Sequence, residues 1–266
     1  MSLRRITSRE YKVMLDHRLF ADRRVGLREL QQVLENLLEC HDLKLQGVFG
    51  NSEKRKIAFL DTPSGLLRRS QLILRHRRDR GSEGTGDFTL KCRSEDRYFA
   101  AGIDLQPLEG VPWKSKFEED IAPPFSSRYS QSVTVSDRRV RKPNRLSQMA
   151  AIFPALGCLK DSDLRTDGDM TLTVVRDFRP RERVYRGLKF WLSDTLPATV
   201  ALILWGITWK SPALCAELSF RFGDPKEHYA FPVVTSAHAL FTSLQTQPCC
   251  RPNSPTKTQL AYGETT

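Results

Sequence analysis

The sequence predicts a mainly β protein of the α+β class, in which an antiparallel sheet is closed or sandwiched and a few helices pack outside it. Three observations support this prediction. Many short segments alternate apolar with polar residues, few segments have helical spacing, and strands and helices do not alternate along the chain. The length of 266 residues allows one large barrel or two small domains with a buried core.

The first half of the chain supplies strands around one amphipathic helix. We expect the first strand at 8–15, and a helix at 26–39 because its apolar residues recur at helical spacing. Polar turns that contain glycine or proline, at 62–65 and 79–86, separate the strands that follow. Those further strands are expected at 56–61, 72–78, 88–93 and 115–121.

The second half begins with a connection and then returns to strands. Residues 122–144 are rich in Pro, Ser and Arg, so we expect a long loop or a mobile lid there. Helices are expected at 146–156 and 234–244. The expected strands are 170–176, 183–192, 200–207 and 213–222. We therefore expect one domain over 1–245, followed by an irregular tail at 246–266.

The chain is basic, with 42 Lys and Arg against 31 Asp and Glu and a formal net charge of +11. This excess favours an anionic partner such as a nucleotide, polyphosphate, nucleic acid or membrane surface, although a basic solvated surface gives the same composition. Basic runs at 75–78 and 138–142 have no interleaved aromatic residues, which argues against nucleic acid. The apolar run at 196–209 is too short to span a membrane, so we expect a buried strand with a turn.

The cysteines and the N-terminal residues indicate the cellular compartment. The six cysteines include no C-x-x-C pair and no histidines cluster near them, so a zinc site is not predicted. Free thiols in a reducing cytosol are the simpler interpretation. The charged residues between positions 4 and 10 do not form a signal peptide. We therefore expect a cytoplasmic protein that does not bind membranes.

Charged residues share faces on several expected strands, because side chains alternate along a strand. The sets are Ser8, Glu10 and Lys12; Arg75 and Arg77; Thr89, Lys91 and Arg93; and Glu217, Ser219 and Arg221. One interpretation is an ordinary sheet with a solvated face over an apolar core. The other is a barrel whose inward charges bind a polyphosphate, with Arg and Lys on phosphate oxygens and carboxylates on Mg²⁺ or Mn²⁺.

Three motifs follow one another in the first half of the chain. They are Phe59-Leu-Asp-Thr-Pro-Ser-Gly-Leu-Leu67, Leu74-Arg-His-Arg-Arg78 and Phe88-Thr-Leu-Lys91. Their order and spacing resemble the CYTH superfamily of triphosphate tunnel enzymes, which reads as a Tyr/Phe-Asp-Thr-Pro turn, an L-R-x-R strand and a T-L-K strand. The resemblance implies an eight-stranded antiparallel tunnel and a divalent metal, Mg²⁺ or Mn²⁺. It also implies hydrolysis of inorganic triphosphate, thiamine triphosphate or RNA 5′-triphosphate ends, or cyclisation of ATP.

The family's two acidic motifs are incomplete in this chain. The opening E-x-E-x-K strand matches Ser8-Arg-Glu-Tyr-Lys12, with Ser8 in the place of the first Glu, and a late E-x-E pair matches Glu217-Leu-Ser219. The resemblance implies catalytic roles for Lys12, Arg75, Arg77 and Lys91, and substrate binding by Arg75, Arg77, Lys91, Arg183 and Arg221. The implied metal ligands are Glu10, Glu217, Glu118 and Asp194.

These observations leave two hypotheses about function. The first is metal-dependent hydrolysis of a small-molecule triphosphate, such as inorganic, nucleoside or thiamine triphosphate, in a basic tunnel. The second is a non-catalytic protein that binds polyphosphate or nucleotide, because Ser8 and Ser219 replace two carboxylates and a site with fewer carboxylates holds Mg²⁺ less well. Phosphate release from several triphosphates with added metal separates the two hypotheses.

Overall fold

The computed structural model describes residues 4–81, 86–136, 142–159 and 169–264. Within these residues the chain forms two compact units. Unit 1 comprises Arg4 with 55–117 and 128–179, and unit 2 comprises 5–54, 118–127 and 180–264. No helix in the described part of the chain is both long and apolar enough to cross a lipid bilayer.

Unit 1 is built mainly on four antiparallel strands. They are β2 (Glu53–Asp61), β3 (Leu72–Asp79), β4 (Asp87–Ser94) and β6 (Ser126–Ser136). Short elements accompany them: α2 (Leu66–Arg69), α3 (Arg97–Gly102), α4 (Leu146–Ala150), the 3-10 helices η2 (Pro154–Cys158) and η3 (Val175–Asp177), and β7 (Thr173–Val174). Alternate residues of the strands, including Leu74, Leu90 and Val133, form the apolar core with Phe153 of the helical layer.

Unit 2 combines strands with the two longest helices. Its strands are β1 (Ser8–Leu15), the end of β5 (Trp113–Ala122), β8 (Arg181–Tyr185), β9 (Lys189–Ser193), β10 (Leu196–Gly206) and β11 (Cys215–Phe222). Its helices are η1 (His17–Phe20), α1 (Arg23–Glu39), α5 (Phe231–Gln245) and α6 (Lys257–Tyr262). Tyr11 stacks on Phe220 at 4.8 Å and meets Phe241 edge-on at 5.1 Å, so α5 packs on the apolar side of β1 and β11.

The strands pair in the order β11-β1-β5-β6-β4-β3-β2-β8-β10-β9, and β10 also pairs with β11. Nine strands of the described residues therefore form a closed ring of pairings, which confirms the mainly β class and the closed sheet. The ring has nine strands rather than the expected eight. Strand directions cannot alternate all the way around an odd ring, and β1 and β5 accordingly run parallel. The wholly antiparallel arrangement expected from the sequence is wrong at this pair.

Several expected elements have different bounds in the structure. The segment 122–144, expected as a loop or lid, contains β6, and its residues 137–141 lie outside the described residues. The expected helix 146–156 ends at Ala150, and η2 begins at Pro154, which cannot continue the preceding helix. The expected strand 170–176 is reduced to β7, beyond which Arg176 has a φ of 51°. The tail expected to be irregular contains α6.

The expected strand 183–192 divides into β8 and β9 at Gly187. This residue has a φ of 114°, which suits glycine, and a Cβ there would lie only 2.3 Å from the carbonyl oxygen of Val48. The close approach of the loop at Val48 therefore requires glycine and ends the strand.

Candidate functional site

Unit 2 carries a face of alternating charged residues, here called the polar face. In the antiparallel pair, Glu10 lies opposite Arg221 and Lys12 opposite Ser219. In the parallel pair, Ser8 lies opposite Glu118 and Glu10 opposite Asp120. Directly opposed residues point to the same side of a sheet. The polar face therefore contains Ser8, Glu10, Lys12, Glu118, Asp120, Glu217, Ser219 and Arg221.

The two serines in carboxylate positions are bonded to carboxylates on the polar face. Ser8 Oγ donates to Glu118 Oε1 at 2.8 Å, and Ser219 Oγ donates to Glu10 Oε1 at 2.9 Å. The sequence prediction that both serines share a face with Glu10 and Glu217 is therefore consistent with the register.

Lys and Arg side chains offset part of the negative charge of the polar face. Lys12 Nζ lies 2.7 Å from Asp120 Oδ1 and 3.0 Å from Glu10 Oε2. Arg221 Nη1 lies 3.2 Å from Glu118 Oε1. Burial and the nearby Asp120 would raise the pKa of Glu10, but Lys12 and the hydrogen bond from Ser219 outweigh them and the pKa is lowered. Glu10 therefore stays ionised in its ion pair.

The fit of a divalent metal can be judged from these contacts. In the described residues, no three His, Cys, Asp or Glu side chains come together in a way that could hold a metal ion. Glu10, Glu118 and Asp120 already accept from serine hydroxyls or from the cations of Lys12 and Arg221. In this arrangement the carboxylates are engaged by side-chain cations and do not fit Mg²⁺ or Mn²⁺.

Unit 1 carries a second charged face, here called the basic face. The register of β2, β3 and β4 sets Arg75 between Phe59 and Thr89, and Lys91 opposite Ile73. Residues two positions away on each strand share that side. The basic face therefore contains Arg55, Arg75, Arg77, Lys91 and Arg93, with Asp79 and Asp87 among them. Arg77 pairs with Asp87 at 2.9 Å, and Arg55 with Asp79 at 3.5 Å.

The Asp-Thr-Pro turn has a structural explanation. The carboxylate of Asp61 accepts hydrogen bonds from the backbone N–H groups of Thr62, Leu67 and Arg68 at 2.8–3.0 Å. Thr62 Oγ1 accepts from the N–H of Leu66 at 3.0 Å. These bonds satisfy the first N–H groups of α2, which would otherwise be unpaired in a buried turn. The motif thus fixes the chain between β2 and β3, which carry part of the basic face.

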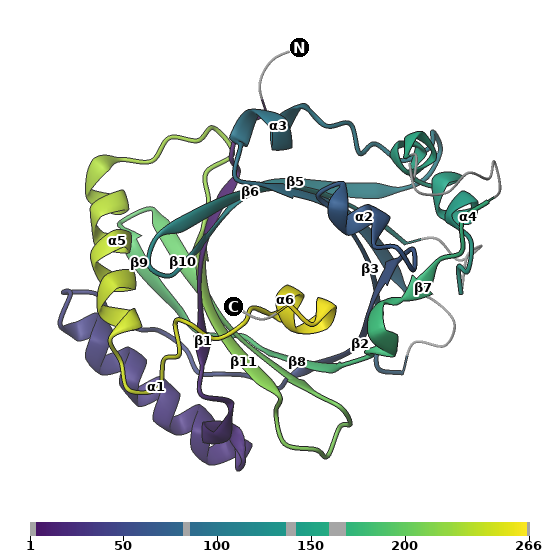
Figure 1. Cartoon of the computed structure of the whole chain (residues 1–266). Coiled ribbons are helices and arrows are strands. Elements are labelled where there is room, and N and C mark those ends of the chain that lie inside the picture. The colour runs from purple at the N-terminus through teal and green to yellow at the C-terminus, as the bar shows by residue number, and fades with distance from the viewer. Residues whose placement is uncertain (1–3, 82–85, 137–141, 160–168, 265–266) are drawn as a thin grey trace. The chain divides into compact units, whose positions relative to one another are not determined.

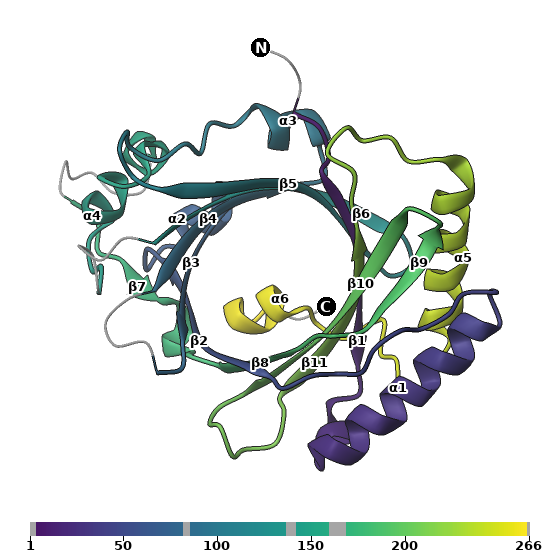
Figure 2. The same ribbon diagram turned by 180° about the vertical axis from the view of Figure 1, so that it is seen from behind.

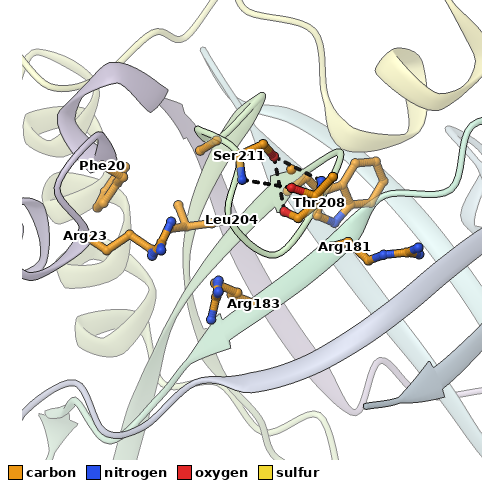
Figure 3. Close-up of a pocket in the computed structure, with 10 residues that line it drawn as sticks. Phe20, Arg23, Arg181, Arg183, Leu204, Thr208 and Ser211 are labelled. Atoms are coloured by element: carbon orange, nitrogen blue, oxygen red, sulfur yellow. Dashed lines mark hydrogen bonds between the residues drawn. The ribbon is translucent and has the colours of Figure 1, made fainter. Parts of the chain in front are cut away.

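Two predicted site residues lie away from these faces. Arg183 lies opposite Leu204 on the apolar side of β8 and β10, and its guanidinium donates to the carbonyl oxygen of Trp209 at 2.7 Å. Figure 3 shows Arg183 lining a small pocket of unit 2 with Arg23 and Arg181. Asp194 lies in the turn between β9 and β10 and is exposed. The structure therefore does not bring either residue together with Glu10 and Glu217.

Comparison with known proteins gives matches among solved structures alone. No family model and no curated protein matches the chain. The matching structures include proposed adenylate cyclases. One, from Hippeastrum, is described as having a dominant triphosphatase activity. Its sequence is 12% identical to this chain, and the alignment covers 98% of this chain and 97% of that chain with a TM-score of 0.44. A second, from Bacillus halodurans, is 12% identical, with 98% of each chain covered and a TM-score of 0.40. At these values the likeness assigns neither a family nor a function to this chain.

The structure adds residues that sequence reasoning missed. They are Asp120 on the polar face, Glu182 on the same side of the neighbouring strand β8, and Lys257, which approaches from the tail. Asp120 could have been found, because it lies two positions after Glu118. Glu182 rather than Arg183 shares the side of Glu217, since Glu182 pairs with Trp205 and Glu217 pairs with Ile203. No local pattern indicates the place of Lys257.

Proposed function

We propose that the basic face of unit 1 binds the phosphate chain of a small-molecule triphosphate or polyphosphate. The observation that supports this proposal is the register of β2, β3 and β4, which directs five cationic side chains to one side of the sheet. Four acidic residues of these strands alternate to the same side, namely Glu53, Asp61, Asp79 and Asp87, and the Asp61 carboxylate is engaged by the backbone of the turn that follows β2. On β3 and β4 the four cations Arg75, Arg77, Lys91 and Arg93 outnumber Asp79 and Asp87, and this excess of positive charge favours an anion that carries several charges.

The surroundings of these cations suit phosphate oxygens. Arg75 and Lys91 are half-buried, and they lie between the buried side chains of Ile57, Phe59 and Ile73. Contacts with charged groups are stronger where water is partly excluded. A guanidinium can grip two phosphate oxygens at once, while an ammonium supplies a compact charge. The hydroxyls of Thr89 and Thr134, 2.9 Å apart, add polar groups on the same side.

The test compares anions of different length. Tripolyphosphate should raise the melting temperature more than orthophosphate at equal ionic strength, because several cations can contact a longer anion at once. Equal shifts for the two anions, or shifts that sodium chloride reproduces, would contradict a dedicated polyphosphate site.

Hydrolysis of a triphosphate is the second candidate function. The gathering of Glu10, Glu118 and Asp120 on one face of unit 2 favours it, because carboxylates are typical of phosphohydrolase sites. Their ion pairs with Lys12 and Arg221 favour binding without turnover. Phosphate release from tripolyphosphate, ATP and thiamine triphosphate, measured with Mg²⁺ and with Mn²⁺, decides between the two. Release that depends on the added metal would support hydrolysis.

A further inference from the structure

The C-terminal segment of unit 2 is anchored beside the end of its first strand, β1. The N–H of Asp16 donates to the carbonyl oxygen of Cys249 at 2.8 Å, and the N–H of Arg251 donates to that of Met14 at 2.7 Å. Arg251 also forms an ion pair with the Asp16 carboxylate at 2.8 Å. These contacts fix the direction in which the chain leaves β1.

The segment then forms α6 on the side of the strands opposite α1 and α5. Figures 1 and 2 show α6 on that side in two opposite views. Thr256 and Gln259 form a capping box at its start, and Gly263 ends it with a φ of 73°. Defined signals at both ends thus place Lys257, the first residue of the helix.

Lys257 is held by a carboxylate and an aromatic ring. Its Nζ lies 2.9 Å from Glu217 Oε1 and 6.0 Å from the centroid of the Trp205 ring. The side chains of Glu217 and Lys257 are 8% and 18% exposed, so the pair is largely shielded from water. The Trp205 indole donates to Glu182 Oε2 at 3.0 Å, which fixes the ring.

These groups match the chemistry of an ammonium ion. A carboxylate supplies the opposite charge, and an indole face attracts a cation through its quadrupole. Glu217 would be left as a buried charge without compensation if the cation were removed. We infer that Glu217 and Trp205 form a binding site for a primary ammonium group, and that Lys257 is its tethered occupant. An alkylamine or polyamine enters this site only when the C-terminal segment leaves it. The inference does not depend on phosphate binding by unit 1.

The inference is tested by chemical rescue of Lys257→Ala. This variant should melt at a lower temperature than the parent, and n-propylammonium, which replaces the atoms that the substitution removes, should restore the melting temperature in a saturable manner. Sodium chloride at equal ionic strength should raise the melting temperature of this variant less. Tetramethylammonium should also raise it less, because it cannot donate a hydrogen bond. Lys226→Ala, which removes an exposed lysine of the same unit, should melt like the parent and show no response specific to propylammonium.

Two results would overturn the inference. One is an equal effect of propylammonium and sodium chloride on Lys257→Ala. The other is a larger effect of Mn²⁺ than of propylammonium at the same total charge, since that would indicate a metal site.

A second measurement serves if Lys257→Ala does not fold. In the double variant Glu217→Gln with Lys257→Met, both charges are absent, so its loss of stability should be smaller than the sum of the two single losses. Here the second single variant is Lys257→Met, which keeps the length of the side chain. Additive losses in this cycle would show that Glu217 and Lys257 do not interact.

Discussion

The hydroxyl of Ser8 donates to Glu118 Oε1 across 2.8 Å, from β1 to the strand that runs parallel to it. Ser219 makes the corresponding bond to Glu10 from β11. Each serine therefore holds a place where a carboxylate would lie directly against another carboxylate. Lys12 and Arg221 offset two of the four carboxylates of the polar face, and the neutral serines keep the excess of negative charge from being larger.

The double variant Ser8→Glu with Ser219→Glu should become dependent on a divalent cation. In the absence of metal, the two new carboxylates repel the neighbouring carboxylates of Glu118 and Glu10, so the melting temperature of the variant should fall. Mn²⁺ should restore it, because the two added carboxylates supply hard oxygen ligands that Lys12 and Arg221 do not already engage. Differential scanning calorimetry with and without Mn²⁺ measures the effect. Ser193→Glu, at an exposed position of β9, is the control and should show no metal dependence.

Arg75→Ala and Lys91→Ala should weaken tripolyphosphate binding by roughly 10- to 100-fold each, since each removes a contact between charged groups. The free energy of unfolding should change little, because like charges on one face repel each other. Lys56→Ala is the matched control, since Lys56 is an exposed lysine on the opposite side of β2. Titration calorimetry measures binding, and urea denaturation measures stability. Unfolding of either variant with unchanged binding of the folded fraction would show a structural role instead.

Asp61→Ala should reduce the free energy of unfolding by about 2–4 kcal/mol, because it leaves three backbone N–H groups of the turn without their acceptor. Asp61→Asn keeps one acceptor oxygen and should lose less. Urea denaturation of the two variants gives both values. Equal losses for Ala and Asn would show that the charge, rather than the hydrogen bonds, stabilises the turn.

Acid should destabilise unit 1 through His76 before the carboxylates titrate. Burial, followed by the charge of Arg78, lowers the pKa of His76 from 6.5 to about 4, and its ring stacks on Phe88 at 4.3 Å. The unfolded chain therefore takes up the proton first, and stability that is full above pH 6.5 is lost as the pH falls toward 4. The loss should be at most about 3 kcal/mol.

The variant His76→Phe isolates this contribution. Phenylalanine keeps an aromatic ring against Phe88 but cannot be protonated, so the variant should remain stable over the same pH interval. Urea denaturation at several pH values compares it with the parent. Parallel pH profiles for the two proteins would assign the acid effect to other groups.

The alternation of side chains along a strand predicted which residues share a face, because the orientation of one residue fixes the orientation of every other residue in the strand. β1 begins and ends at the predicted residues, and the predicted grouping of Arg75 with Arg77 follows from the register with β4. The chemical roles of these residues stay predictions. Alternation does not say which of two neighbours faces a given side, and Arg183, whose role the resemblance implied, lies on the side of β8 opposite that of Glu182.

Other features depend on distant parts of the chain. β6 was hidden in a segment rich in Ser and Arg, although Val133 and Val135 alternate with Ser132 and Thr134 there. The position of Lys257 against Glu217 arises from the path of the tail, which no local pattern encodes. Likewise, the parallel pairing of β1 and β5 depends on how many strands complete the ring.

The pairing of β1 with β11 joins residues that are 209 positions apart, such as Glu10 and Ser219. During synthesis at about 5–20 residues per second, β1 leaves the ribosome roughly 10–40 seconds before this partner exists. For that interval its edge and the ring of Tyr11 lack the neighbours that cover them in the finished protein. Contacts of such large sequence separation also slow folding. β1 is thus made well before β11, and it is among the last strands to gain both of its neighbours.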